Sequence, residues 1–154
     1  MFRNSDHALK WAFRVSGSGA ESENKKRAQA ALIIGMAGRL LDANEMAWVM
    51  AKYAKALLGG ERERQVADQL VKVVIASAGT GAHSRRGYEK LVRIYFGQSI
   101  TMLSVRTDMR CRDAQVQEIR KAVFDNLDSI SNRAFFKMND EMRRAGLILE
   151  EVAA

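Results

Sequence analysis

The 154-residue sequence contains no proline, and its eleven glycines are the residues that interrupt its apolar patterns. A β-rich fold normally uses prolines and Asn-Gly pairs in its turns, whereas helices commonly end at a glycine. Alanine, methionine, glutamate, arginine and lysine, which favour helices, are plentiful. The sequence therefore predicts an all-α protein, and its 47% of apolar residues are enough to build the core of a helical bundle.

Apolar residues recur with the period of about 3.6 that is typical of an amphipathic helix. Helices are expected over 8–15, 25–41, 44–58 and 61–78. Either Asp42 or Asn44 can cap the third of these helices. The glycine-rich, charged segment 79–87 is expected to be a loose basic linker.

This pattern divides the chain into three parts. The first is an N-terminal helical bundle over 1–82, with a surface for self-association or for a partner protein. The second is the region 83–130, and the third is a C-terminal helix within 131–154 that packs back on the bundle.

The net charge of +7, with a pI of about 9.9, favours polyanionic partners, of which nucleic acid is the commonest. Cys111 is the only cysteine, so no internal disulfide can form. His7 and His83 are distant in sequence, and a structural zinc needs about four N or S ligands, so we expect neither a metal nor another cofactor. Residues 1–19 are amphipathic without a long apolar run, so we expect no signal peptide and no membrane span.

The segment 88–130 has the order of elements of a helix-turn-helix. A short helix over 88–96 ends at Gly97, and a second short helix follows, with Ser99 as its cap and Ile100 and Leu103 turned inward. After a polar turn, a longer helix begins at about Arg112. In this motif the second helix braces against the DNA backbone, while the first turns of the third helix enter the major groove. The inward side of the third helix is predicted to consist of Val116, Ile119, Val123 and Leu127.

The outward side of that helix carries the groups that could read DNA. Arginine and glutamine have bidentate geometry for guanine and adenine, and a carboxylate accepts from cytosine or orients a neighbouring arginine. The predicted DNA-binding residues are Arg106, Arg110, Arg112, Asp113, Gln115, Gln117, Glu118, Arg120 and Lys121. The predicted phosphate contacts, which set register and salt dependence, are Arg85, Arg86, Lys90 and Arg93. The alternative is the ordinary solvated face of an amphipathic helix.

Residues 91–127 resemble the C-terminal promoter-reading domain of bacterial sigma factors. The matching positions are Phe96-Gly97, the segment 99–103, Val116, Ile119 and Ala122. The resemblance implies a sigma-like helix-turn-helix and places Asp113, Ala114, Gln115 and Glu118 where sigma factors contact bases. The chain lacks an aromatic-rich promoter-melting segment, so it is not expected to be a complete sigma factor. Ala114 and Gln115 replace charged readers, so a different DNA site is expected.

The chain also resembles the smaller class of phage late-gene antitermination protein Q. The resemblance depends on the segment 9–12 (LKWA), the segment 32–40 (LIIGMAGRL) and the junction 95–97 (YFG) before the helix-turn-helix. It implies a regulator that binds double-stranded DNA near a late promoter in the cytoplasm of a bacterial host cell. Such a protein loads onto RNA polymerase, alone or with a sigma factor, and lets it read through terminators. The helices within 44–78 have no counterpart in the shortest members and could contact polymerase or self-associate.

The sequence leaves three other interpretations to consider. An enzyme is not expected, because the carboxylates are scattered and no acid or histidine is spaced to work with Cys111. A phage terminase small subunit or a repressor-type module also pairs a helix-turn-helix with an oligomerising bundle. A plain helical interaction protein would use an aromatic groove made of Trp48, Tyr53, Phe135 and Phe136.

Overall fold

The computed structural model describes residues 1–17, 24–54, 59–78 and 84–149, and within these ranges it contains seven α-helices. They are α1 (Ser5–Gly17), α2 (Asn24–Leu40), α3 (Ala43–Tyr53), α4 (Glu61–Ala78), α5 (Arg85–Tyr95), α6 (Met102–Met109) and α7 (Asp113–Arg144). The β pairing in these ranges is one isolated bridge between Phe2 and Ile148. The prediction of an all-α fold is confirmed, and Asp42 is the residue that caps α3.

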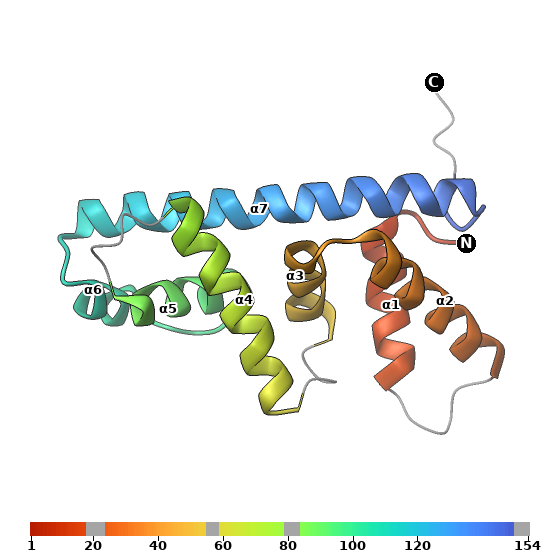
Figure 1. Cartoon of the computed structure of the whole chain (residues 1–154), viewed down its shortest axis with the longest axis horizontal. Helices are drawn as coiled ribbons and strands as arrows, with labels where there is room; N and C mark the ends of the chain where they lie inside the picture. Colours follow the sequence, from red (N-terminus) through yellow and green to blue (C-terminus); the bar gives the residue numbers. More distant parts are fainter. Residues whose placement is uncertain (18–23, 55–58, 79–83, 150–154) are drawn as a thin grey trace.

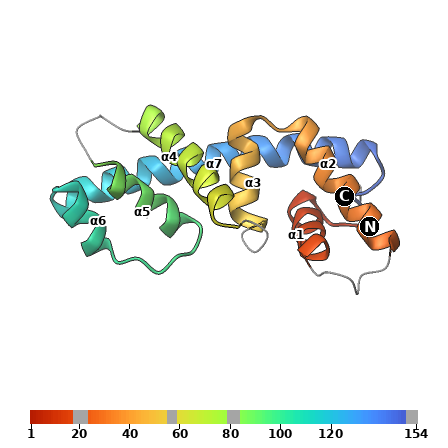
Figure 2. The ribbon, with the colours of Figure 1, turned by 60° about the horizontal axis from the view of Figure 1, so that its bottom comes forward.

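The helix α7 runs along the whole molecule, and the other six helices pack against it (Figure 1). Its 32 residues span about 48 Å at 1.5 Å per residue. The helices α4, α5 and α6 lie beside its N-terminal half, and α1 and α2 lie beside its C-terminal half, with α3 between the two groups. A second view shows the same two groups in front of α7 (Figure 2). The molecule is therefore elongated, with α6 and the start of α7 at one end and α1 and α2 at the other.

The expected break between a helix ending near Ile130 and another starting near Asn132 is wrong, because α7 is continuous. Ser131 fits inside the helix, where its hydroxyl donates to the carbonyl of Asp128 at 2.9 Å, and Asn132 faces solvent. The buried row continues across this point and holds the helix to both halves of the core. It consists of Val116, Val123, Leu127, Ile130, Ala134, Met138 and Met142.

Trp48 joins α3, α5 and α7 at the middle of the molecule. Its ring centroid lies 5.7 Å from that of Phe96 and 5.4 Å from that of Phe135. Its side chain is buried, and Tyr53 and Phe135 pack against the same core, so the groove that a plain helical interaction protein would use does not form from these three rings. Phe136, the fourth residue of that set, is 77% exposed.

Glu45 fixes α3 to α7. Its side chain is fully buried, and its Oε1 accepts from Lys137 Nζ at 2.5 Å and from the backbone N–H of Asp42 at 3.0 Å. Asp42 Oδ1 in turn accepts from the N–H of Glu45 at 2.8 Å, which completes a capping box. Arg133 Nε lies 3.8 Å from the second carboxylate oxygen.

The two ends of the described chain meet beside the end of α7. The N–H of Phe2 donates to the carbonyl of Leu147 at 2.9 Å, and the N–H of Leu149 donates to the carbonyl of Phe2 at 3.1 Å. The N–H of Ser5, at the start of α1, donates to Asn139 Oδ1 at 2.8 Å. These bonds hold α1 against α7.

No helix in the described ranges is both long enough and apolar enough to cross a membrane.

The phenol of Tyr95 gives a pH-dependent test of this packing. Burial, together with donation of its hydroxyl to Asp128 Oδ1 at 2.7 Å, raises the pKa of Tyr95 from 10.0 to about 12. Between pH 10 and pH 12 the unfolded chain loses this proton and the folded chain keeps it, so this contribution to stability is present below pH 10 and falls as the pH rises. We expect urea unfolding to show a larger loss of stability over this interval for the native protein than for Tyr95→Phe. Equal losses would exclude the contribution of this phenol.

Candidate nucleic-acid interface

The helices α5 and α6 and the first turns of α7 form one end of the molecule (Figure 1). The segment 84–87 was expected to belong to a loose linker, but Ser84 is the N-cap of α5 and Gly87 is buried inside that helix. The rest of the expected linker, residues 79–83, lies outside the described residues. Gly87 is small enough to let α5 approach the side chain of Met109 on α6 closely.

The start of α6 differs from the sequence prediction. The cap is Thr101 and not Ser99, since Thr101 Oγ1 accepts from the N–H of Ser104 at 3.3 Å. The later start turns Val105 and Met109 into the core, and Leu103, which was expected to face inward, is 61% exposed.

Arg110 makes the turn between α6 and α7. Its backbone is in the left-handed region, with φ 53° and ψ 43°, and its N–H donates to the carbonyl of Arg106. Glycine adopts this conformation without the strain that a Cβ atom causes.

We expect Arg110→Gly to raise the free energy of unfolding by up to about 1 kcal/mol while it removes one cation from this surface. Thermal unfolding and DNA affinity would be measured on the same variant. Arg112→Gly is the matched control, because Arg112 has ordinary extended φ and ψ values of −76° and 157°. A lower stability for Arg110→Gly than for Arg112→Gly would contradict the strain argument.

The first turns of α7 present a polar surface above a buried row. Val116, Val123 and Leu127 are buried as expected, and Ile119 packs partly against the core. Of the predicted reading residues, Arg110, Arg112, Asp113, Gln115, Gln117, Glu118 and Lys121 are exposed. Arg106 and Arg120 are half-buried, and the guanidinium carbon of Arg120 lies 5.0 Å from the ring centroid of Phe124.

Several predicted contact residues are held by carboxylates of the protein itself. Arg106 Nη1 donates to Asp113 Oδ1 at 2.7 Å, so this carboxylate orients an arginine at the start of α7. Lys90 Nζ is 2.5 Å from Asp108 Oδ2 and also donates to Ser104 Oγ. The remaining pairs are Arg93 with Glu89 at 2.8 Å and Arg85 with Asp68 at 3.0 Å.

The cations of this end that make no ion pair within the described ranges are Arg86, Arg110, Arg112, Arg120 and Lys121. They are therefore better candidates for phosphate contacts than Lys90, whose side chain is only 24% exposed. Sequence reasoning missed the carboxylate and hydroxyl that hold Lys90, because Asp108 and Ser104 reach it only when α6 folds against α5.

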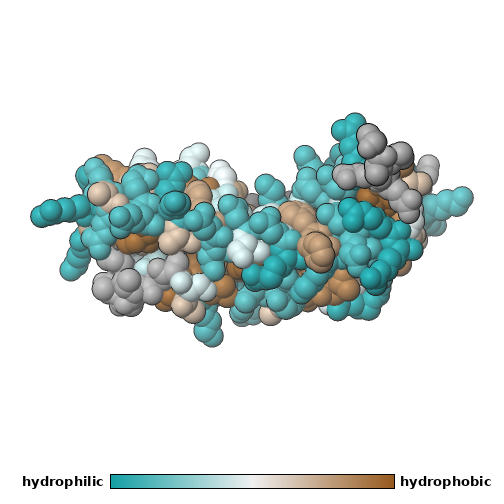
Figure 3. Space-filling view, turned by 90° about the horizontal axis from the view of Figure 1, so that it is seen from above, coloured by the Kyte–Doolittle hydropathy of each residue, from teal (hydrophilic) through white to brown (hydrophobic). Residues whose placement is uncertain are grey.

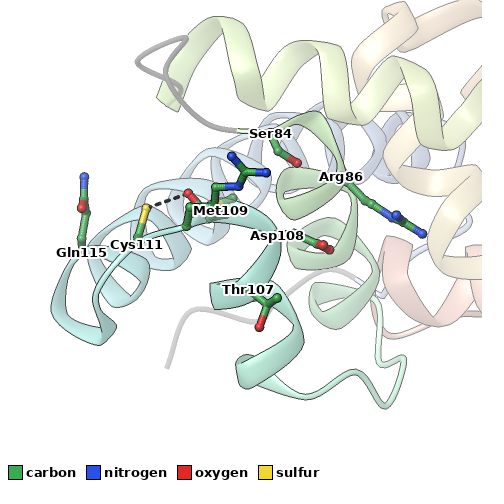
Figure 4. Close-up of a pocket in the computed structure, with 8 residues that line it drawn as sticks. Ser84, Arg86, Thr107, Asp108, Met109, Cys111 and Gln115 are labelled. Atoms are coloured by element: carbon green, nitrogen blue, oxygen red, sulfur yellow. Dashed lines mark hydrogen bonds between the residues drawn. The ribbon is translucent and has the colours of Figure 1, made fainter.

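Two open depressions lie along α6. One, of about 740 Å³, is shown in Figure 4 and is lined by Ser84, Arg86, Thr107, Asp108, Met109, Arg110, Cys111 and Gln115. The other, of about 470 Å³, is lined by Arg86, Glu89, Lys90, Arg93, Ser99, Ile100, Thr101 and Ser104. Arg86 borders both, and in Figure 4 its side chain extends away from Cys111 and Gln115. The surface on either side of α6 is thus concave and rich in hydrogen-bond donors, which suits a phosphodiester backbone.

No group of three His, Cys, Asp or Glu side chains in the described part of the chain is arranged to hold a metal ion. Cys111 Sγ lies 3.2 Å from the carbonyl oxygen of Met109, at the turn before α7. His83 lies outside the described residues.

Comparisons of the chain with protein-family models, with curated proteins and with solved structures give no match. The features of the molecule that bear on its function are the geometry of α5, α6 and α7 and the distribution of charge.

Proposed function

We propose that the protein is a sequence-specific, double-stranded DNA-binding regulator of transcription. The observation that carries this proposal is the polar start of α7, held at one end of the molecule by its buried row and braced by α6. The major groove of B-DNA is about 12 Å wide and admits an α-helix. Because no other element extends beyond the start of α7 and α6 at that end, these two helices can reach a duplex first.

In this proposal Arg112 and Gln115 read bases, and Arg86, Arg110 and Lys121, which make no ion pair within the described ranges, hold the backbone. Arg112 is the N-cap and Gln115 lies in the first turn, so both side chains are at the tip of the helix and exposed. Asp113 supports the reading by orienting Arg106. A bidentate side chain contributes about 1–3 kcal/mol of discrimination against a wrong base.

The most specific form of the proposal is a phage antiterminator, as the resemblance to the smaller class of protein Q implies. The protein would bind near a late promoter in the cytoplasm of a bacterial cell and load onto RNA polymerase, alone or with a sigma factor. It is proposed to act without catalysis and without a cofactor. The helices α1 to α4, which lie away from the reading end, would supply the polymerase contact or a contact between copies.

Two substitutions test the reading helix. Arg112→Ala and Gln115→Ala are each expected to weaken binding to a duplex chosen by selection from random DNA by roughly 5- to 150-fold. Fluorescence anisotropy would measure this affinity alongside that for a scrambled duplex, and circular dichroism would show unchanged helicity. Lys72→Ala, at an exposed site on α4, is the matched control. If both reading-helix variants keep the affinity for the selected duplex, α7 is not the reader.

Capture of purified bacterial RNA polymerase distinguishes the antiterminator from simpler DNA-binding modules. Capture that DNA strengthens would support the antiterminator and would lead to a terminator read-through assay. DNA binding without capture would instead indicate a repressor-type module or a terminase small subunit. Binding to neither would overturn the assignment of the helix-turn-helix.

A further inference from the structure

The positive charge of the chain is concentrated at the two ends of α7. Residues 83–130 carry nine basic and six acidic residues, an excess of three. Residues 1–41 carry seven basic and three acidic residues, an excess of four, and the rest of the chain is neutral. The larger excess thus belongs to the segment of α1 and α2, at the end opposite the proposed reading helix.

Six basic side chains lie exposed on α1, on α2 or just before α1. Arg3, Lys10, Arg14, Lys25, Lys26 and Arg39 are exposed, and none of the six makes an ion pair within the described ranges. Asp6 is the one acidic residue in the described parts of this segment, and its carboxylate accepts a hydrogen bond from the hydroxyl of Tyr53. At the other end, by contrast, four of nine cations are held by carboxylates.

Five of these six cations lie on two helices that pack side by side, and Arg3 precedes α1. Lys10 and Arg14 are one turn apart on α1, and Lys25 and Arg39 lie on one side of α2, about four turns apart. The space-filling view from above shows hydrophilic side chains over both ends of the molecule (Figure 3). The two helices lie beside the C-terminal half of α7, whose 32 residues span about 48 Å, the length of roughly 14 base pairs of B-DNA.

We propose that α1 and α2 form a second nucleic-acid contact, which binds phosphodiester backbone without reading sequence. The proposal rests on the proposed function in taking nucleic acid as the ligand, but it uses none of the residues of the reading helix. Its chemistry is that of unpaired cations spread over a broad surface, which is typical of contacts with DNA. Charged residues are depleted at the buried core of protein–protein interfaces, so an acidic protein fits this surface less well. Leu32, which is 50% exposed on α2, is the feature that such a protein would use.

The test compares two triple variants that remove the same charge. The first is Lys10→Gln, Arg14→Gln and Lys25→Gln, and its control is Arg62→Gln, Arg64→Gln and Lys72→Gln, three exposed sites on α4. Affinity for a duplex of about 40 base pairs carrying the selected sequence would be measured against salt concentration. We expect the first variant to lower the slope of log affinity against log salt by about two to three, and the control to leave it near the native value.

Duplexes of different length show whether α1 and α2 bind the same duplex as the reading helix or a separate nucleic acid. If the native protein loses affinity on a duplex of about 12 base pairs and the first variant does not, the second contact lies on the same duplex. If the short duplex binds equally well and the DNA-bound native protein captures a second labelled duplex or a single-stranded RNA, the second contact takes a separate molecule. Either result supports the proposal, provided that thermal unfolding shows both triple variants to be folded.

Equal losses of DNA affinity in the two triple variants would overturn the proposal, because the change in net charge alone would then explain both losses. A native salt slope with lost polymerase capture would also overturn it and would assign the surface to an acidic protein. If Arg112→Ala and Gln115→Ala abolish sequence preference, while the first triple variant binds the selected duplex and captures a second nucleic acid as the native protein does, only the second contact is excluded. The opposite result is a loss of affinity in the first triple variant but not in Arg112→Ala or Gln115→Ala. That result would contradict the proposed reading helix and support the second contact.

Discussion

Gly87→Ala is expected to lower the free energy of unfolding by about 1–3 kcal/mol, because a Cβ atom at this position would lie 2.3 Å from Met109 Cγ. Met109 is 3% exposed, and its Cγ is close to its own backbone, so the side chain cannot move aside without a change of rotamer inside the core. The alternative is that α6 moves away from α5. Because α6 is the bracing helix of the proposed interface, DNA affinity is expected to fall with stability.

A double-mutant cycle with Met109→Ala checks this prediction. In the Met109→Ala background the clash is absent, and Gly87→Ala should be neutral or should stabilise by up to about 1 kcal/mol through helix propensity. Gly38→Ala is the matched control, since Gly38 is also helical but has no atom within 4 Å of the added Cβ, and it should stabilise. Equal changes in urea-unfolding midpoint for Gly87→Ala and Gly38→Ala would contradict the clash.

Glu45→Ala is expected to lower the free energy of unfolding by about 2–4 kcal/mol. The substitution removes half of a capping box, which contributes about 1 kcal/mol, and leaves a cavity and Lys137 without its buried partner. Lys137 remains 39% exposed and can be solvated, so the loss should stay below that of a fully buried ion pair.

Two further variants separate these contributions. Asp42→Ala removes the other half of the capping box and should cost about 1 kcal/mol. Glu45→Gln keeps the acceptor for the N–H of Asp42 but removes the charge beside Lys137, and should give an intermediate loss. Denaturant unfolding would measure the loss of stability in Glu45→Ala, Asp42→Ala and Glu45→Gln and so rank the three variants. If Glu45→Ala costs no more than Asp42→Ala, the contact between α3 and α7 does not stabilise the fold.

The sequence predicted the class of the fold and the approximate helices, because the apolar period is strong in each of them. It failed where a polar residue within a helix resembled a boundary. Ser131 and Asn132 suggested a break in α7, although Ile130 and Ala134 continue the buried row across it. At α6, two neighbouring residues were good caps, and only the packing of Val105 and Met109 selects Thr101 over Ser99.

The outward face of α7 could also be predicted, since the apolar row fixes which side is buried. The neutralisation of Lys90 by Asp108 could not, because it depends on the approach of α5 to α6. The basic excess of residues 1–41 was countable in the sequence. The exposure of those cations and the position of α1 and α2, away from the start of α7, could not be predicted from the sequence.

The position of α7 in the chain constrains how the protein reaches its folded state during synthesis. In the described part of the chain six helices leave the ribosome before α7, yet Val123 and Leu127 complete one half of the core and Met138 and Met142 complete the other. Until α7 emerges, each half exposes an apolar face that nothing covers, so neither half can finish folding early. A nascent chain stalled before residue 113 should therefore be sensitive to protease throughout, and release of α7 should protect both halves together.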